Sequence, residues 1–249
     1  MGILRGWGAG RRSTRLPGGI LGDLAAAPTV PPDTPLTEVE LLAMDLKATG
    51  LDPRRDEMLA IGLVPVRGGQ IHLAGAQHLP VRPRGDVGQS ATLHGLTDDA
   101  LATAAPVEEV LPRALAALLP GGAAPSTGAG GPAPTSYRRL LLAHFAQVET
   151  TFLAAASREV LGGVVRLQVV DTMDVERRLV LRTPVQELRE GRVRLDACRR
   201  RRGPPRYRAH SALTDALACA ELFLAQCAEL EDFWGRPLTV GDVAGRRLL

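Results

Sequence analysis

The chain has 249 residues, of which 45% are hydrophobic and 23% charged. This composition is typical of globular proteins, and the length allows one domain with a well-buried core plus tails. A formal net charge of +3 permits a polyanionic partner without requiring one. Aromatic residues make up only 3% of the chain, which argues against a broad aromatic platform for single-stranded nucleic acid.

The cysteine content and the lack of a long apolar segment indicate the cell compartment. Cys198, Cys219 and Cys227 form no CxxC pair, and an odd number argues against a disulfide framework. No run of eighteen or more apolar residues is present, so no membrane partner is expected. We therefore predict a cytoplasmic protein. The pair Arg11-Arg12 would also suit a twin-arginine signal, but a simple basic tail is the favoured interpretation.

The first half of the chain predicts an arm, three strands and two helices. Residues 1–36 are rich in Gly, Pro and Arg and are expected to form an N-terminal arm. Three apolar segments joined by short turns predict antiparallel strands. Helices are expected to begin at Thr97 and at Pro106, the second running to Leu119. The three predicted strands cover residues 39–46, 57–66 and 70–81.

The second half alternates between strands and helices, which predicts parallel pairing. Together the two halves predict an α/β fold with a mixed five-stranded sheet, three antiparallel strands and then two parallel ones, flanked by helices. This domain is expected to span residues 37–230, with a flexible insertion at 120–136 and a tail at 231–249. The later strands are predicted at 138–145 and 165–171, and the helices at 146–161, 172–181, 193–202 and 211–230.

Three local patterns could carry chemistry. The first, AMDLKATGLDP at 43–53, has an acid near the end of a strand followed by a Thr-Gly turn. The second, LLLAHFAQVETTFL at 140–153, has a histidine followed five residues later by a glutamate. The third, YRAHSALTDALA at 207–218, has a histidine and an aspartate five residues apart where a helix begins. Each pattern alone is weak, but three in this order form a strong combined signal.

In this order the patterns resemble the histidine-type DEDD 3′–5′ exonucleases, the family typified by the proofreading epsilon subunit of bacterial DNA polymerase III. The motifs of that family read Asp-x-Glu-x-Thr-Gly, His-Asn-x-x-Phe-Asp and His-x-Ala-x-x-Asp. The resemblance runs from about Leu36 to Leu230 and implies a ribonuclease-H-like fold. It also implies metal-dependent hydrolysis of the 3′-terminal phosphodiester of DNA or RNA. The implied partners are single-stranded or frayed 3′ ends and a DNA polymerase.

The resemblance assigns the catalytic roles residue by residue. Asp45, Glu149 and Asp215 would hold two Mg²⁺ or Mn²⁺ ions, which carboxylate oxygens suit. His210 would be the general base, since the pKa of histidine lies near working pH. His144 is expected to be structural and to pack at the end of a strand.

The resemblance also assigns substrate contacts. Thr49 and Gly50 would form the turn that approaches the terminal nucleotide. The basic run at 197–210, which leads into the third motif, would attract phosphates. Within it, Arg206 and Arg208 are the expected substrate-binding residues.

Lys47 stands where the first motif of the family has its second carboxylate. An ammonium about 4 Å from a divalent cation would be repelled by roughly 8 kcal/mol at an effective dielectric constant near 20. Lys47 must therefore turn to solvent, lose its proton or stand in for one cation, which predicts a single-metal, weakened or silent site. Phe145 also replaces the asparagine of the second motif. The alternative functions are a catalytically silent nucleic-acid-binding pseudo-exonuclease and a polymerase-associated scaffold.

Overall fold

The computed structural model describes residues 18–85, 101–121, 136–180, 191–205, 207 and 211–248. Within these ranges, seven strands form one sheet in the order β3-β2-β1-β5-β6-β7, and β4 also pairs with β2. The strands are β1 (Glu40–Ala48), β2 (Met58–Arg67), β3 (Gln70–Ile71), β4 (Gln77–Pro80), β5 (Leu140–Ala143), β6 (Arg166–Asp171) and β7 (Ala244–Leu248).

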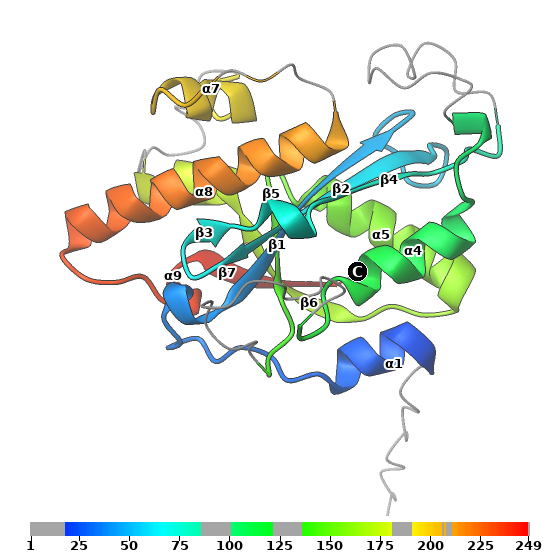
Figure 1. Cartoon of the computed structure of the whole chain (residues 1–249), viewed down its shortest axis with the longest axis horizontal. Helices are drawn as coiled ribbons and strands as arrows, with labels where there is room; N and C mark the ends of the chain where they lie inside the picture. Colours follow the sequence, from blue (N-terminus) through cyan, green and yellow to red (C-terminus); the bar gives the residue numbers. More distant parts are fainter. Residues whose placement is uncertain are drawn as a thin grey trace, which may run out of the picture.

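Helices cover both faces of the sheet. The helix α8 lies across one face, and α1, α4 and α5 lie on the other (Figure 1). The α-helices are α1 (Gly19–Ala26), α4 (Val107–Ala116), α5 (Gln147–Leu161), α6 (Thr172–Val175), α7 (Leu195–Arg200), α8 (Ala212–Trp234) and α9 (Val240–Val243). The shorter turns are η1 (Leu36–Glu38), η2 (Leu73–Gly75) and the π-helical η3 (Glu176–Val180).

The pairing of the strands confirms the predicted fold class, although the sheet has seven strands in the described ranges where five were predicted. Strand β1 is antiparallel to β2 and parallel to β5, and β5 is parallel to β6. Successive side chains of a strand point to opposite faces. Leu42 and Met44 of β1 therefore pack into the core beneath α4 and α5, whereas Leu41 and Ala43 pack into the core beneath α8. This alternation puts every odd-numbered side chain of β1 on the α8 side.

The third predicted strand, at 70–81, is not continuous. It divides into β3 and β4, which are separated by the 3-10 turn η2. The side chain of Leu73 is 62% exposed at this break, so the alternation of buried and exposed residues fails there. Both pieces still pair with β2, and the antiparallel half of the sheet keeps its predicted direction.

The structure differs from the sequence prediction at both ends of the domain. Within the predicted arm, Leu21 and Leu24 of α1 are buried in the main core. The backbone of Val30 accepts from and donates to the Gln168 side chain, at 2.8 Å each. The Gly- and Pro-rich composition predicted no packed element here, but two leucines on one helical turn are enough to dock a short helix.

The predicted C-terminal tail is also part of the fold. It begins inside α8, which ends at Trp234, and continues through α9 into β7, which pairs antiparallel with β6. The arm and the tail contact each other, because Leu36 N donates to Leu238 O at 2.9 Å and Val240 N donates to Thr34 O at 3.0 Å. Most of the predicted insertion at 120–136 and the helix start at Thr97 lie outside the described residues. No helix in the ranges that the structure covers is long and apolar enough to cross a membrane.

Candidate active site

The first and third sequence motifs meet where the start of α8 lies against the sheet. Asp45 and Lys47 lie two residues apart on β1 and share the α8 face. Asp45 pairs across the sheet with Gly62 of β2. A β-carbon on Gly62 would lie 2.2 Å from the carbonyl carbon and oxygen of Ala212, the first residue of α8. The missing side chain therefore lets α8 approach closely and brings Asp215 in its first turn toward β1.

Lys47 lies between the two aspartates. Its Nζ donates to Asp215 Oδ2 at 2.6 Å and lies 2.9 Å from Asp45 Oδ2. The Lys47 side chain is only 11% exposed, so the ammonium does not turn to solvent. Of the three outcomes predicted for Lys47, the structure has the third, in which its charge stands in for a cation between two carboxylates.

The charges of this cluster support that description. Burial lowers the pKa of Lys47, but Asp45 and Asp215 raise it by more, and the result lies above the ordinary value for lysine. Lys47 therefore keeps its proton. Burial raises the pKa of Asp45 to about 7, with Lys47 opposing the rise and Asp215 adding to it. The Lys47 ammonium thus forms an ion pair with Asp45 as well as with Asp215.

The acid of the second motif lies beside this pair. Glu149 is in the first turn of α5 and is 4% exposed. Burial, followed by the charges of Asp45 and Asp171, raises its pKa well above the ordinary value. The structure thus brings Asp45 and Asp215 together around Lys47. Glu149 lies close enough for the charge of Asp45 to raise its pKa.

With Lys47 in this position, the cluster does not fit two divalent ions. Its ammonium already lies against the oxygens of Asp45 and Asp215 that would face such ions. Across the described ranges, no group of three or more His, Cys, Asp or Glu residues is arranged to hold a metal ion. The predicted two-ion site is therefore replaced by an internal ion-pair cluster.

The Thr-Gly turn of the first motif is braced by Asp56, which the sequence patterns did not single out. Thr49 Oγ1 donates to Asp56 Oδ1 at 3.2 Å and accepts from Glu57 N at 3.0 Å. Asp52 N donates to Asp56 Oδ2 at 2.8 Å. A β-carbon on Gly50 would lie 2.4 Å from the Asp56 carboxylate, so glycine is required where the turn closes. An acid seven residues after the threonine of a Thr-Gly turn is the signal that could have indicated this contact.

The remaining predicted site residues, Arg206, Arg208 and His210, lie outside the described residues. Tyr207, between the two arginines, is described. The Arg199 guanidinium lies 4.8 Å from the centre of the Tyr207 ring, and the Tyr207 hydroxyl donates to Glu221 of α8. Tyr207 is therefore held against the α7 segment and α8.

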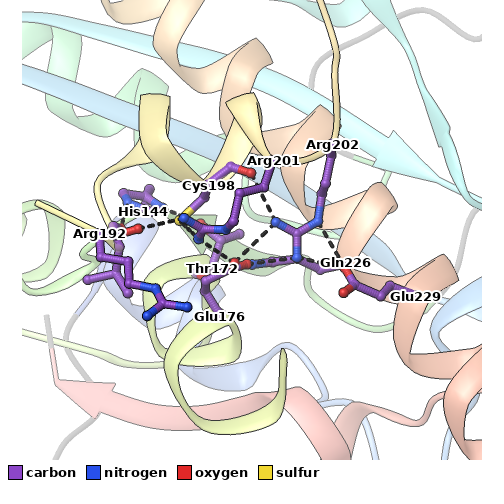
Figure 2. A network of polar contacts seen from close by, with 10 residues as sticks. His144, Thr172, Glu176, Arg192, Cys198, Arg201, Arg202, Gln226 and Glu229 are labelled. Carbon is purple, nitrogen blue, oxygen red and sulfur yellow. Dashed lines mark hydrogen bonds and ion pairs between the residues drawn. The ribbon is translucent and has the colours of Figure 1, made fainter. Parts of the chain in front are cut away.

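Four arginines of the basic run are used within the fold. Glu176, which is fully buried, accepts from Arg201 at 2.5 Å and from Gln226 at 2.7 Å and pairs with Arg202 at 3.0 Å. Figure 2 shows these side chains converging on Glu176 from the turn that follows α7 and from α8. Arg199 pairs with Glu221, and Arg200 pairs with Asp196. The ion pairs of Arg199, Arg201 and Arg202 hold the α7 segment against the domain, whereas the Arg200–Asp196 pair lies within α7; the sequence did not predict this role.

His144, which directly follows β5, is partly buried and packs at the end of a strand, as expected for a structural residue. Its Nε2 donates to the Val193 carbonyl at 2.9 Å, and its Nδ1 lies 2.8 Å from Thr172 Oγ1. Burial lowers the pKa of His144, although Asp171 opposes the shift. The His144 ring thus links the second motif to Thr172 at the start of α6 and to Val193, which precedes α7.

Glu176→Gln is expected to lower the free energy of unfolding by about 2–3 kcal/mol, because two arginines lose their charged acceptor. Burial alone would raise the pKa of Glu176, but hydrogen bonds from Arg201, Gln226 and Arg202 lower it below its ordinary value of 4.5. A group with a lowered pKa contributes stability above its unfolded-state pKa. The loss of unfolding free energy in the variant, measured by urea unfolding, should therefore be complete at pH 7 and should shrink as the pH falls below about 4.5.

Glu229→Gln, at the exposed end of the network, is the control. An equal effect of both substitutions would contradict this account.

Comparisons with known proteins agree with the fold. No family model matches the chain. It is 28% identical over 193 residues to the PolC-type DNA polymerase III of Thermotoga maritima and 26% identical to that of Thermotoga petrophila. Each match covers 77% of this chain and 12% of the polymerase, so the chain spans about an eighth of the length of these relatives.

Solved structures with the same fold are exonucleases. The nuclease domain of 3′hExo, a DEDDh family member bound to rAMP, has a TM-score of 0.58 at 13% identity, covering 79% of this chain and 95% of that one. A full-length 3′-exonuclease has a TM-score of 0.57 at 16% identity, covering 81% and 84%. E. coli exonuclease I in complex with a dT13 oligonucleotide has a TM-score of 0.57 at 12% identity, covering 79% and 43%.

These likenesses define the class of the fold as that of the DEDD-type exonucleases. The resemblance predicted from the three sequence motifs is confirmed. The chain differs from the motif of that class at Lys47, and this difference decides what the site can do.

Proposed function

We propose that this protein acts at the 3′ ends of nucleic acid as a 3′–5′ exonuclease domain whose turnover is limited by Lys47. The observation that carries the proposal is the meeting of Asp45, Asp215 and Glu149, which come from three separate motifs, in one cluster at the start of α8. The likeness to a DEDDh nuclease domain bound to rAMP supports a nucleotide as the ligand. The likeness to a PolC-type polymerase supports a DNA polymerase as a partner.

In this proposal the residues of the chain divide the work at the scissile phosphate. His210 takes a proton from the attacking water. The Lys47 ammonium contributes one fixed positive charge beside the phosphate, where a charge placed in advance stabilises the transition state. Thr49 and Gly50 present the turn to the terminal nucleotide, and Arg206 and Arg208 contact the phosphate backbone. The products are nucleoside 5′-monophosphates.

Mg²⁺ or Mn²⁺ would bind to Asp45 and Asp215 only after Lys47 leaves them. A bound divalent ion would supply stronger charge stabilisation than an ammonium does. Because Lys47 is held by two ion pairs and is largely buried, we expect a site that works slowly even at high metal concentration.

A second function is favoured by the same two ion pairs: recognition of 3′ ends without hydrolysis. The Lys47 ammonium pairs with both Asp45 and Asp215, so these carboxylates have a cationic partner without a metal ion. A phosphodiester could then dock there and remain intact. A polymerase-associated scaffold would use the fold without nucleic acid and would bind no oligonucleotide at low salt.

Both functions are tested by incubating the protein with a 5′-labelled single strand in Mg²⁺ and in Mn²⁺, with His210→Ala as the matched control. Slow shortening from the 3′ end that disappears in the control is the expected result. Equal, negligible shortening by both proteins would reject the exonuclease. Binding of the same strand, measured by fluorescence anisotropy, would then separate the silent binder from the scaffold.

A further inference from the structure

Phe145 has a backbone conformation that aromatic residues rarely adopt. Its φ angle is +65°, and it is the one non-glycine residue with positive φ among the described residues. This left-handed region brings the β-carbon of an L-residue close to its own backbone, which disfavours bulky side chains most. Asparagine, which the second motif of the exonucleases has at this position, tolerates it better. The chain therefore retains an aromatic ring where a smaller residue would suit the backbone.

A buried carboxylate holds this unfavourable turn in place. Asp171, at the end of β6, accepts from Phe145 N and Ala146 N at 3.0 Å each. It also accepts from Met173 N at 3.0 Å. Strained backbone of this kind persists where the surroundings fix it, and it occurs frequently at binding sites.

The ring held in this way is exposed. Phe145 is 43% exposed, whereas Phe152 and Phe223 are 3% and 1% exposed. It borders a hollow of about 170 Å³ whose other lining residues are Gln147, Asp171, Met173, Asp174 and Arg177. This volume is smaller than a typical ligand pocket and suits one ring system rather than a whole nucleotide. An aromatic ring, a thioether and the polar groups of Gln147 and Arg177 are the chemistry that stacks on a planar base and contacts its edge.

The hollow lies next to the acidic cluster. Phe145 follows β5 by two residues, and β5 runs parallel to and beside β1, the strand that carries Asp45. Asp171, which braces Phe145, is also among the charges that act on Glu149, after burial and Asp45. A strand whose 3′ end lay at Asp45 and Asp215 would have an unpaired base within reach of Phe145.

We propose that Phe145 and the hollow beside it form a stacking subsite for one unpaired nucleobase of a single strand. This inference rests on the proposed function, because the strand must approach the acidic cluster. It explains why an exposed phenylalanine is kept in a left-handed backbone in a chain with only four phenylalanines.

The experiment measures binding of a short fluorescent oligothymidylate to the full chain and to three variants, together with their melting temperatures. Phe145→Asn keeps a residue that suits positive φ but removes the ring, and binding should become on the order of tenfold weaker with an equal or higher melting temperature. Phe145→Tyr should restore binding. Phe233→Ala, which removes a 60% exposed phenylalanine of α8, is the matched control for binding and should leave the affinity for the oligothymidylate unchanged.

A strand with abasic sites in place of its bases separates base stacking from other effects. The wild type should lose affinity for the abasic strand, and Phe145→Asn should cause no further loss. Equal binding of the intact strand by the wild type and Phe145→Asn would overturn the subsite and leave the proposed function standing. Failure of the wild type to bind any strand would overturn both.

Discussion

Lys47→Glu is expected to raise the rate of 3′-terminal hydrolysis in Mg²⁺ or Mn²⁺ by at least about 100-fold. The substitution removes the ammonium that lies 2.6 Å from Asp215 and 2.9 Å from Asp45. It also supplies the fourth carboxylate that the first motif of the exonucleases has at this position. Supporting groups of a metal site change metal affinity or activity by about 10- to 100-fold each, and here a repulsive group is replaced by an attractive one. The rate is measured by the release of nucleoside monophosphate from a labelled strand.

The stability of the same variant should depend on metal ions. Without its internal cation, the cluster contains Asp45, Asp215 and a new carboxylate at close range. The melting temperature should therefore fall in EDTA and recover when Mn²⁺ binds to the folded state. The wild type, which carries its own positive charge at this point, should melt at nearly the same temperature in both conditions.

Lys47→Met is the control that removes the ammonium without adding a ligand. It should lower stability by about 3 kcal/mol, because two partly buried carboxylates lose their partner, and it should gain far less activity than Lys47→Glu. Wild-type activity equal to that of Lys47→Glu would contradict the limiting role of Lys47.

Gly62→Ala is expected to lower the free energy of unfolding by about 3 kcal/mol or more, a decrease of roughly 10 °C in melting temperature. The added methyl group would lie 2.2 Å from Ala212 and 2.4 Å from Leu213 backbone atoms. Backbone at the start of a helix cannot move aside as a flexible side chain can, so α8 must shift as a whole.

The shift of α8 should also damage the site. Asp215 would move away from Lys47, and binding of a 3′-terminated single strand should weaken together with stability. Gly245→Ala is the matched control, because it is a strand glycine with no atom within 4 Å of the new methyl group. Thermal unfolding that is unchanged by Gly62→Ala would mean that the close approach of β2 and α8 does not constrain the fold.

The parts of the fold with strong periodicity could be predicted from the sequence. The strands around Asp45 and the helix that carries Asp215 appear within one to four residues of their expected bounds, because apolar alternation and helical spacing both act locally. The order of the three motifs then placed the acidic residues on elements that the sheet brings together. Both the fold class and the resemblance to the exonucleases followed from this local information.

The position of Lys47 could not be predicted beyond a choice of three outcomes. The position of the Lys47 ammonium depends on the distance between β1 and α8. That distance is set by Gly62, which belongs to none of the three motifs. The use of the basic run was missed for a similar reason. The basic run predicted phosphate contacts for its arginines. In the structure Arg201 instead donates to the buried carboxylate of Glu176, which lies 25 residues earlier in the chain. Pairings between distant segments leave no local pattern.

The pairing of β7 with β6 has a consequence for self-association. An outer strand with unpaired backbone groups is a template on which another chain can add its own strand. Among the described residues β7, which has five residues, is itself the outer strand on one side of the sheet, and at the opposite edge β3 and β4 are only two and four residues long, so every outer strand is short. The sheet therefore offers little backbone for uncontrolled strand addition, and intermolecular recognition falls to side chains and helices.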